Sequence, residues 1–137
     1  GVLHCCHAVL PGMIDRAGGR IITIVSDAAR SGEAQMAVYA AAKAGAAGLM
    51  RSLAVEGGRH GVTVNSIALG TMRTPISEAF WAEEDNPRAK GLLQKYAIRR
   101  PGLPEDVAAL SVFLASDRAS WITGQTYPLN GGASFAL

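Results

Sequence analysis

The sequence has 137 residues, of which 49% are hydrophobic and 18% are charged, with a formal net charge of +2 at pH 7. This length is enough for one domain with a buried core, and the composition excludes a disordered chain. The basic residues are scattered, and no apolar run approaches the roughly 18 residues of a membrane-spanning helix, so we expect neither a nucleic-acid nor a membrane partner.

The first predicted element is a helix over residues 1 to about 16. Pro11 should kink or break this helix because it removes a backbone donor, and Gly18-Gly19 should end it. The helix is marked by apolar residues at helical spacing, namely Val2, Leu3, Cys6, Val9, Leu10, Met13 and Ile14.

Cys5 and Cys6 are adjacent, so on a helix their side chains point in different directions and a disulfide between them is not expected. Their flanking residues His4 and His7 would fan around the helix rather than converge, and no metal site is predicted. We see no signal-peptide pattern at the N-terminus. Together these features predict a reducing compartment and a cytoplasmic location.

A strand is predicted over residues 20–26, a nearly continuous apolar and β-branched run that is typical of burial on both faces of a parallel sheet. Residues 27–36 are small and polar, which predicts a loop. This loop would lie at the carboxyl end of the strand, where open α/β sheets place their ligands.

The next predicted helix, residues 37–57, carries Tyr39 and Lys43, which are about one helical turn apart and therefore leave the same face. A lysine ammonium beside a phenol favours the phenolate, so such a tyrosine can give or take a proton near neutral pH. Ser26 lies thirteen residues before Tyr39, and its hydroxyl could hold a substrate oxygen. By itself, Tyr-x-x-x-Lys is a weak signal, because on most helices this pair is a packed aromatic ring and a solvated lysine.

Small residues dominate this helix over residues 40–48, which indicates close packing against a neighbour or simply high helix propensity. This surface of small residues and the apolar stripe of residues 2–14 together are larger than one sheet layer can cover. We therefore expect a homo-oligomer, a dimer or a tetramer, packed through these helices.

The remaining elements continue an α/β alternation. A second buried strand over residues 62–69 should pair in parallel with the first, with the 37–57 helix crossing between them. Short amphipathic helices are expected over 76–100, and a helix begins at Pro104, which suits a first turn. A last strand covers 125–129. On the Pro104 helix the residues expected to be buried are Val107, Leu110, Val112, Phe113 and Leu114.

Several of these segments resemble the short-chain dehydrogenase/reductase family. Ser26, Tyr39 and Lys43 match its catalytic Ser, Tyr and Lys. Further matches run in order along the chain, at residues 19–26, 62–70 and 104–108, at Thr123-Gly124-Gln125 and at Asn130-Gly131-Gly132. Within the family, the sequence looks closest to 3-oxoacyl reductases and hydroxyacyl-CoA dehydrogenases.

This resemblance implies an oxidoreductase that interconverts a carbonyl and a secondary alcohol with NAD or NADP. The substrate it favours is a 3-oxoacyl or 3-hydroxyacyl thioester, with a simple or cyclic secondary alcohol as the alternative. It implies that the backbone around Gly70 and Met72 meets the nicotinamide, and that Thr74 meets a carboxamide or phosphate oxygen. Leu69 stands where the family usually has Pro. It also makes residues 76–100 a lid over the substrate, with packing of this segment against the domain as an alternative of equal weight.

The Gly-rich dinucleotide turn that the family carries after its first strand is absent from these 137 residues. We therefore interpret residues 1–137 as one domain that forms the C-terminal half of a doubly wound, Rossmann-like fold, with three strands and flanking helices. A non-catalytic fragment or an oligomerisation module is the alternative from another functional class.

Overall fold

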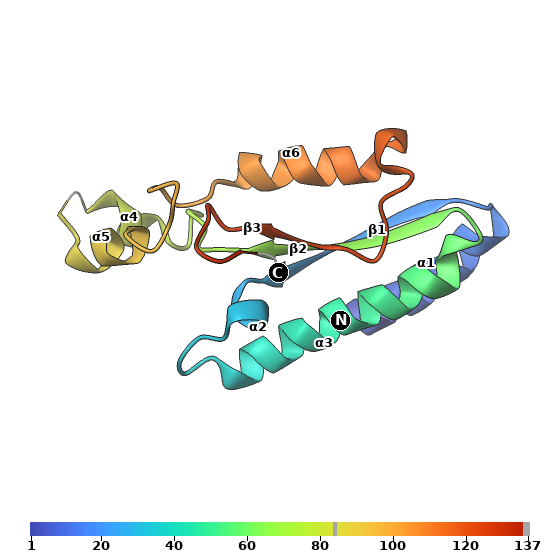
Figure 1. Ribbon diagram of the computed structural model, residues 1–137, viewed down its shortest axis with the longest axis horizontal. Helices are drawn as coiled ribbons and strands as arrows, with labels where there is room; N and C mark the ends of the chain where they lie inside the picture. Colours follow the sequence, from blue (N-terminus) through green and yellow to red (C-terminus); the bar gives the residue numbers. More distant parts are fainter. Residues whose placement is uncertain (84, 136–137) are drawn as a thin grey trace.

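The computed structural model describes residues 1–83 and 85–135 of the chain. It is an α/β structure in which one sheet is covered by helices on both faces (Figure 1). The elements in chain order are α1 (Val2–Asp15), β1 (Gly19–Ser26), α2 (Ala28–Ser31), α3 (Ala37–Gly58), β2 (Val62–Leu69), α4 (Glu78–Ala82), α5 (Pro87–Leu93), α6 (Pro104–Ala115), a 3-10 turn (Asp117–Ala119) and β3 (Thr126–Leu129).

The sheet has the order β1-β2-β3, and both neighbouring pairs are parallel. The β1–β2 register runs from Gly19 opposite Val62 to Ser26 opposite Leu69. The predicted parallel pair with the 37–57 helix between its strands is therefore confirmed. All three strands end at the same side of the sheet, beyond which α4 and α5 lie (Figure 1).

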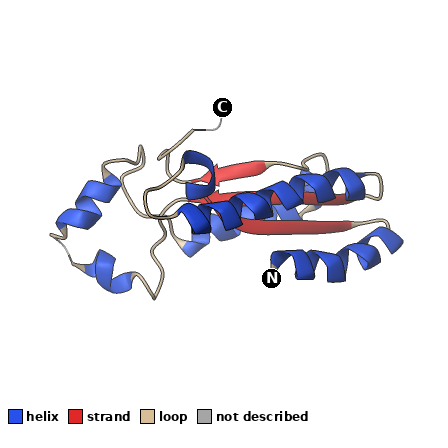
Figure 2. Cartoon of the chain, turned by 90° about the horizontal axis from the view of Figure 1, so that it is seen from below, coloured by secondary structure: helices blue, strands red, loops and turns tan. Residues whose placement is uncertain are grey.

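Helices α1 and α3 cover one face of the sheet and lie side by side on it (Figure 2), whereas α6 covers the opposite face. Three apolar clusters in the described part of the chain hold these layers together, and two of them show how each face is covered. The first joins Cys6 of α1 and Met50 of α3 to residues of β1 and β2, and the second joins Leu114 of α6 to Ile67 of β2. Burial of such side chains is the main favourable term in folding.

The expectation that β1 is buried on both faces is wrong for this chain, whereas that for β2 is confirmed. Seven of the eight residues of β2 are buried. In β1, burial alternates, and Ile24 is 39% exposed. The physical reason is the position of β1 at the edge of the sheet, where only the face toward α1 and α3 is fully covered.

Helix α1 occupies nearly the predicted range, and its end differs from expectation. It runs through Pro11 without a break. Its end depends on Ala17 rather than on the glycines: Ala17 adopts a left-handed φ of 53°, and the N–H of Gly18 donates to the carbonyl oxygen of Met13 at 3.0 Å. This bond closes the last turn in the manner of a Schellman cap.

Two further local expectations are corrected. The stretch 27–36, expected to be a loop, contains the short helix α2. On α6, Leu114 is fully buried, but Val112 is 70% and Phe113 39% exposed, because the helix packs on the sheet with one narrow side only.

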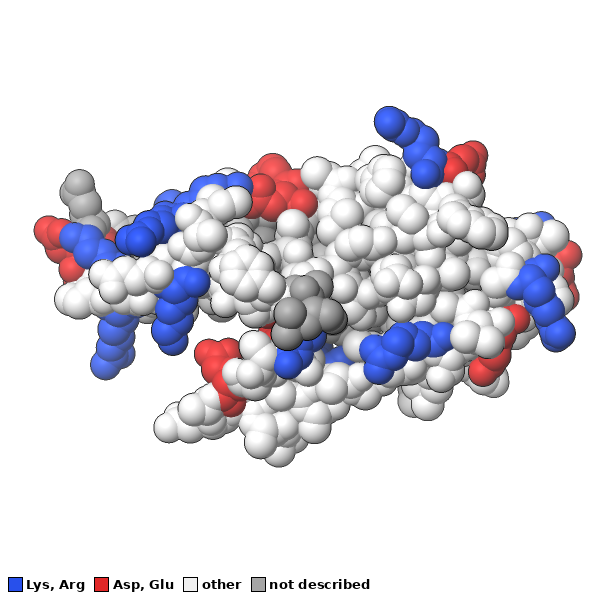
Figure 3. Space-filling model, viewed as in Figure 1, with Lys and Arg blue, Asp and Glu red and all other residues white. Residues whose placement is uncertain are grey.

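Acidic and basic side chains both occur on the face drawn in Figure 3, and neither sign forms a continuous patch there. Within the described residues, no helix is long and apolar enough to cross a membrane. The same part of the chain contains no group of three or more His, Cys, Asp and Glu residues arranged to hold a metal ion.

Candidate active site

A cavity of about 540 Å³ opens at the carboxyl ends of the strands. Ser26, Tyr39 and Gly70 line it, three residues that the sequence had placed in one site. Phe80 and Leu92, from the α4–α5 region, line the same cavity and give it an apolar side. A cavity in this position agrees with the ligand sites of open parallel sheets.

Ser26 is the last residue of β1 and is half-buried. Its Oγ accepts a hydrogen bond from the N–H of Ala28 at 3.3 Å. Because this contact uses an acceptor lone pair, the hydroxyl proton remains able to point at a substrate oxygen.

Tyr39 lies in the first turn of α3, and its side chain is accessible from the cavity, with 44% of the residue exposed. Lys43 follows one turn later, and its Nζ lies 5.8 Å from the centroid of the Tyr39 ring. Nζ also donates to the carbonyl oxygen of Ile24 in β1 at 3.1 Å. The ammonium is thus held between the strand and the phenol ring.

Gly70 has a structural role in addition to the cofactor contact that was predicted for it. A Cβ at this position would lie 2.9 Å from Cα of Asn130 and 3.1 Å from the hydroxyl of Tyr96. The space beside Gly70 is therefore filled by the protein itself. Gly70 is required where the chain leaves β2 because Asn130 follows β3 in direct contact with it.

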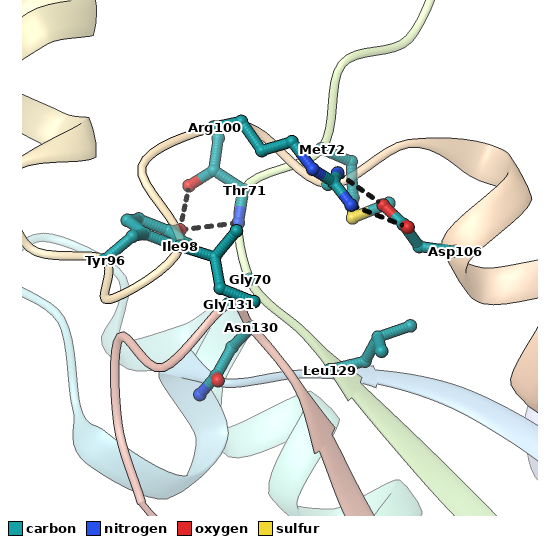
Figure 4. A pocket seen from close by; sticks show the side chains of 11 residues that line it. Gly70, Thr71, Met72, Tyr96, Ile98, Arg100, Asp106, Leu129, Asn130 and Gly131 are labelled. Atoms are coloured by element: carbon teal, nitrogen blue, oxygen red, sulfur yellow. Dashed lines mark hydrogen bonds and ion pairs between the residues drawn. The ribbon is translucent and has the colours of Figure 1, made fainter.

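Met72 and Thr74 do not line the cavity that contains Ser26 and Tyr39. Met72 lines a smaller cavity of about 140 Å³ next to it, shown in Figure 4, which shares Gly70 with the first. The Thr74 N–H donates to Oγ of Ser77 at 2.9 Å, which fixes the turn before α4. Of the residues predicted to bind the cofactor, Tyr39 and Gly70 thus line the large cavity and the others do not.

Tyr96 belongs to the segment 76–100 that the resemblance makes a lid over the substrate, but it was not predicted as a catalytic or cofactor-binding residue. It is 6% exposed and lines both cavities. Its hydroxyl accepts from the N–H of Thr71 at 2.8 Å and donates to Oγ1 of the same residue at 2.9 Å (Figure 4). These bonds tie the α5 region to the end of β2. In the sequence, only its aromatic side chain within an amphipathic segment indicated that Tyr96 could belong to the site.

Arg100 and Asp106 form a bidentate ion pair at the rim of the smaller cavity, with distances of 2.7 and 2.9 Å (Figure 4). The Asp106 carboxylate also accepts from the N–H of Leu103 at 2.8 Å, which caps α6. The hydrogen bonds from Arg100 and then from Leu103 lower the pKa of Asp106 to about 2. This pair fixes the segment that leads from the α5 region into α6.

The chain matches a family model described as enoyl-(acyl carrier protein) reductase over residues 1–134. It is 42% identical over 136 residues to the acetoacetyl-CoA reductase of Rhizobium meliloti, covering 99% of this chain and 55% of that protein. It is 43% identical over 131 residues to the 3-oxoacyl-(acyl-carrier-protein) reductase of Salmonella typhimurium, covering 96% and 52%.

Among solved structures, a short-chain type dehydrogenase/reductase from Mycobacterium ulcerans superposes with a TM-score of 0.87 at 30% identity. The match covers 96% of this chain and 47% of that one. The chain thus spans about half the length of the curated relatives it matches.

Proposed function

The chain belongs to the short-chain dehydrogenase/reductase family, and we propose that it is the C-terminal half of a protein that interconverts a carbonyl group and a secondary alcohol. This longer protein is called the parent below. The observation that carries the proposal is that Ser26 and Tyr39 line one cavity while the Lys43 ammonium lies against the Tyr39 ring.

In this mechanism, Tyr39 donates a proton to the carbonyl oxygen during reduction and removes it from the alcohol during oxidation. Ser26 donates a hydrogen bond to the same oxygen and so holds it against the phenol. Lys43 places its positive charge beside the Tyr39 ring, where it would stabilise charge that develops during these transfers. Positioned donors of this kind stabilise the charge that develops on the oxygen.

The cofactor proposed is NAD or NADP, which supplies the hydride when bound. Lys43 fits a role in holding it, because an ammonium has three donor protons and the bond to Ile24 uses one of them. Tyr39 would lie beside the same group. Gly70, Met72 and Thr74 remain proposed contacts of the nicotinamide end, with Gly70 the one of these three that lines the large cavity.

The substrate proposed is a 3-oxoacyl or 3-hydroxyacyl thioester, because the relatives named above are an acetoacetyl-CoA reductase and a 3-oxoacyl-(acyl-carrier-protein) reductase. The apolar side of the cavity, with Phe80 and Leu92, suits an acyl chain. A simple or cyclic secondary alcohol is the alternative substrate, since the same catalytic residues would serve it.

We further propose that the parent is a homo-oligomer located in the cytoplasm. On α3, Val38 and Val55 are 86% and 82% exposed and are therefore open to contact with another surface. A second copy of the protein is the partner that we infer. The thiols of Cys5 and Cys6 are unpaired, as is usual in a reducing compartment.

The proposal is tested by assaying the purified full-length parent with NADH and NADPH. The substrates are 3-oxoacyl thioesters of several lengths, simple and cyclic ketones, and a 2-enoyl thioester, since the family model is described as an enoyl reductase. We expect turnover of the 3-oxoacyl thioesters. Turnover of the enoyl thioester alone would refute carbonyl reduction, and no turnover of any substrate would favour a non-catalytic protein.

A further inference from the structure

Asp27 is a buried carboxylate that the proposed mechanism does not use. It follows Ser26 directly and is 8% exposed. Burying a charged carboxylate is costly unless the group is paired and hydrogen-bonded, so its partners indicate what the residue does.

The partners of Asp27 come from two regions of the chain. One carboxylate oxygen accepts from Nη1 of Arg30 at 2.7 Å and from Oγ of Ser134 at 2.9 Å. The other accepts from Nδ2 of Asn130 at 3.0 Å. Asn130 and Ser134 are 103 and 107 residues away in the sequence, so the carboxylate joins the end of β1 to the segment after β3.

Additional bonds complete this arrangement. Nη2 of Arg30 donates to the carbonyl oxygen of Phe135 at 3.0 Å, and Oδ1 of Asn130 accepts from the N–H of Gly132 at 3.0 Å. We call Asp27, Arg30, Asn130 and Ser134 the C-terminal clamp. Charge-assisted bonds such as those of Asp27 and Arg30 are stronger than neutral ones.

The C-terminal clamp borders the candidate active site. Asp27 lines the large cavity together with Ser26 and Tyr39, and Ala133, which lies inside the clamped segment, lines it too. The segment 130–135 therefore borders the large cavity through Ala133, and it borders the smaller one through Asn130 and Gly131. Gly131 and Gly132 both have positive φ, so this segment is a turn, and a turn is readily displaced unless contacts such as the clamp hold it.

We propose that Asp27 is a positioning residue which, through the C-terminal clamp, holds residues 130–135 in place and thereby sets how tightly the cavity binds its substrate. This inference rests on the proposed function. The Asp27 carboxylate contacts Arg30 and the clamped segment, whereas Ser26 Oγ is held by the N–H of Ala28. Loss of the clamp should therefore affect substrate binding more than the chemical step.

The test compares Asp27→Ala and Ser134→Ala in the full-length parent. Loss of a charge-assisted hydrogen bond corresponds to about tenfold or more in an equilibrium constant. We expect Asp27→Ala to raise KM for the carbonyl substrate by about tenfold, with kcat changed by less than about threefold. Ser134→Ala removes one neutral hydrogen-bond donor and should raise KM less. This milder variant still tests the proposal if Asp27→Ala does not fold.

Asp117→Ala is the matched control, since Asp117 is an exposed carboxylate paired with Arg20 at 3.2 Å and far from the cavity. It should leave KM unchanged. Amide hydrogen exchange gives a readout that needs no activity: exchange in residues 130–135 should accelerate in the Asp27 and Ser134 variants and not in the control.

The outcomes separate the two proposals. Unchanged KM in both clamp variants, or unchanged exchange in residues 130–135, would overturn the role of Asp27. A fall in kcat at constant KM would show a purely structural role and would overturn it as well. If the unsubstituted parent turns over no substrate, the proposed function fails, and the exchange measurement still decides whether the clamp holds this segment.

Discussion

Replacing Gly70 by alanine perturbs the place where β2 and β3 end side by side. The new Cβ would lie 2.9 Å from Cα and 3.1 Å from Cβ of Asn130. Ordinary contacts between carbon atoms are about 3.5–4.0 Å, so the overlap is roughly 0.6 Å or more. Asn130 Cα belongs to the backbone and cannot rotate away, while the bond from Gly70 N–H to the Leu129 oxygen, at 3.0 Å, holds the strands at this distance.

Overpacking of this kind typically costs about 1–3 kcal/mol, and we expect Gly70→Ala to lower the free energy of unfolding by that amount. The assay is urea unfolding of the full-length parent, followed by circular dichroism, with an unchanged slope and a lower midpoint. Gly91→Ala is the control. Gly91 lies in α5 with no atom within 4 Å of its added Cβ, so it should be neutral or stabilise by up to about 1 kcal/mol.

If Gly70→Ala is as stable as the unsubstituted protein, the close approach of Asn130 does not explain the glycine. In that case its place in the site would need another reason, such as direct contact with a ligand.

Three further predictions concern other parts of the chain. Lys43→Met should lower both turnover and cofactor affinity in steady-state assays and fluorescence titrations. Turnover in the direction of alcohol oxidation, in which Tyr39 acts as the base, should partly recover as the pH rises; recovery at no pH would contradict the electrostatic role. Because the folded-state pKa of Asp106 is lowered to about 2, its stabilising contribution should be present above about pH 4 and lost as the pH falls toward 2. In Asp106→Asn, the free energy of unfolding should therefore depend less on pH in this range. An unaltered pH dependence of unfolding would contradict the proposed contribution of the Arg100–Asp106 pair. Val55→Asp should shift the parent toward smaller species in light scattering, and an unchanged mass would remove α3 from the interface.

The sequence predicted the elements whose signal extends over many residues. The long apolar runs of β1 and β2 and the helix between them were located within one or two residues. The four residues of α2 were missed, because one helical turn among small polar residues has no periodicity to detect. The exposure of Ile24 also escaped prediction, since an apolar run is the same for a central and an edge strand.

In the candidate site, contacts between residues close in the sequence could be predicted, whereas contacts between distant residues could not. Tyr39 and Lys43 were predicted as a pair from their spacing of one helical turn together with the family resemblance, and the contact between them follows from that spacing. The bonds of Tyr96 to Thr71 cross 25 residues, and those of Asp27 to Asn130 cross 103. No pattern in one sequence specifies such pairs, because the fold brings them together.

The measurement that tests the central claim most directly is the turnover of Tyr39→Phe in the full-length parent. This change removes the proposed proton donor and keeps the ring that lies against Lys43. General acid–base catalysis contributes about 10²–10⁴-fold, so carbonyl reduction should slow by roughly that factor while NAD(P)H still binds. An unaltered rate would contradict the proposed role of Tyr39, whichever carbonyl compound is the substrate.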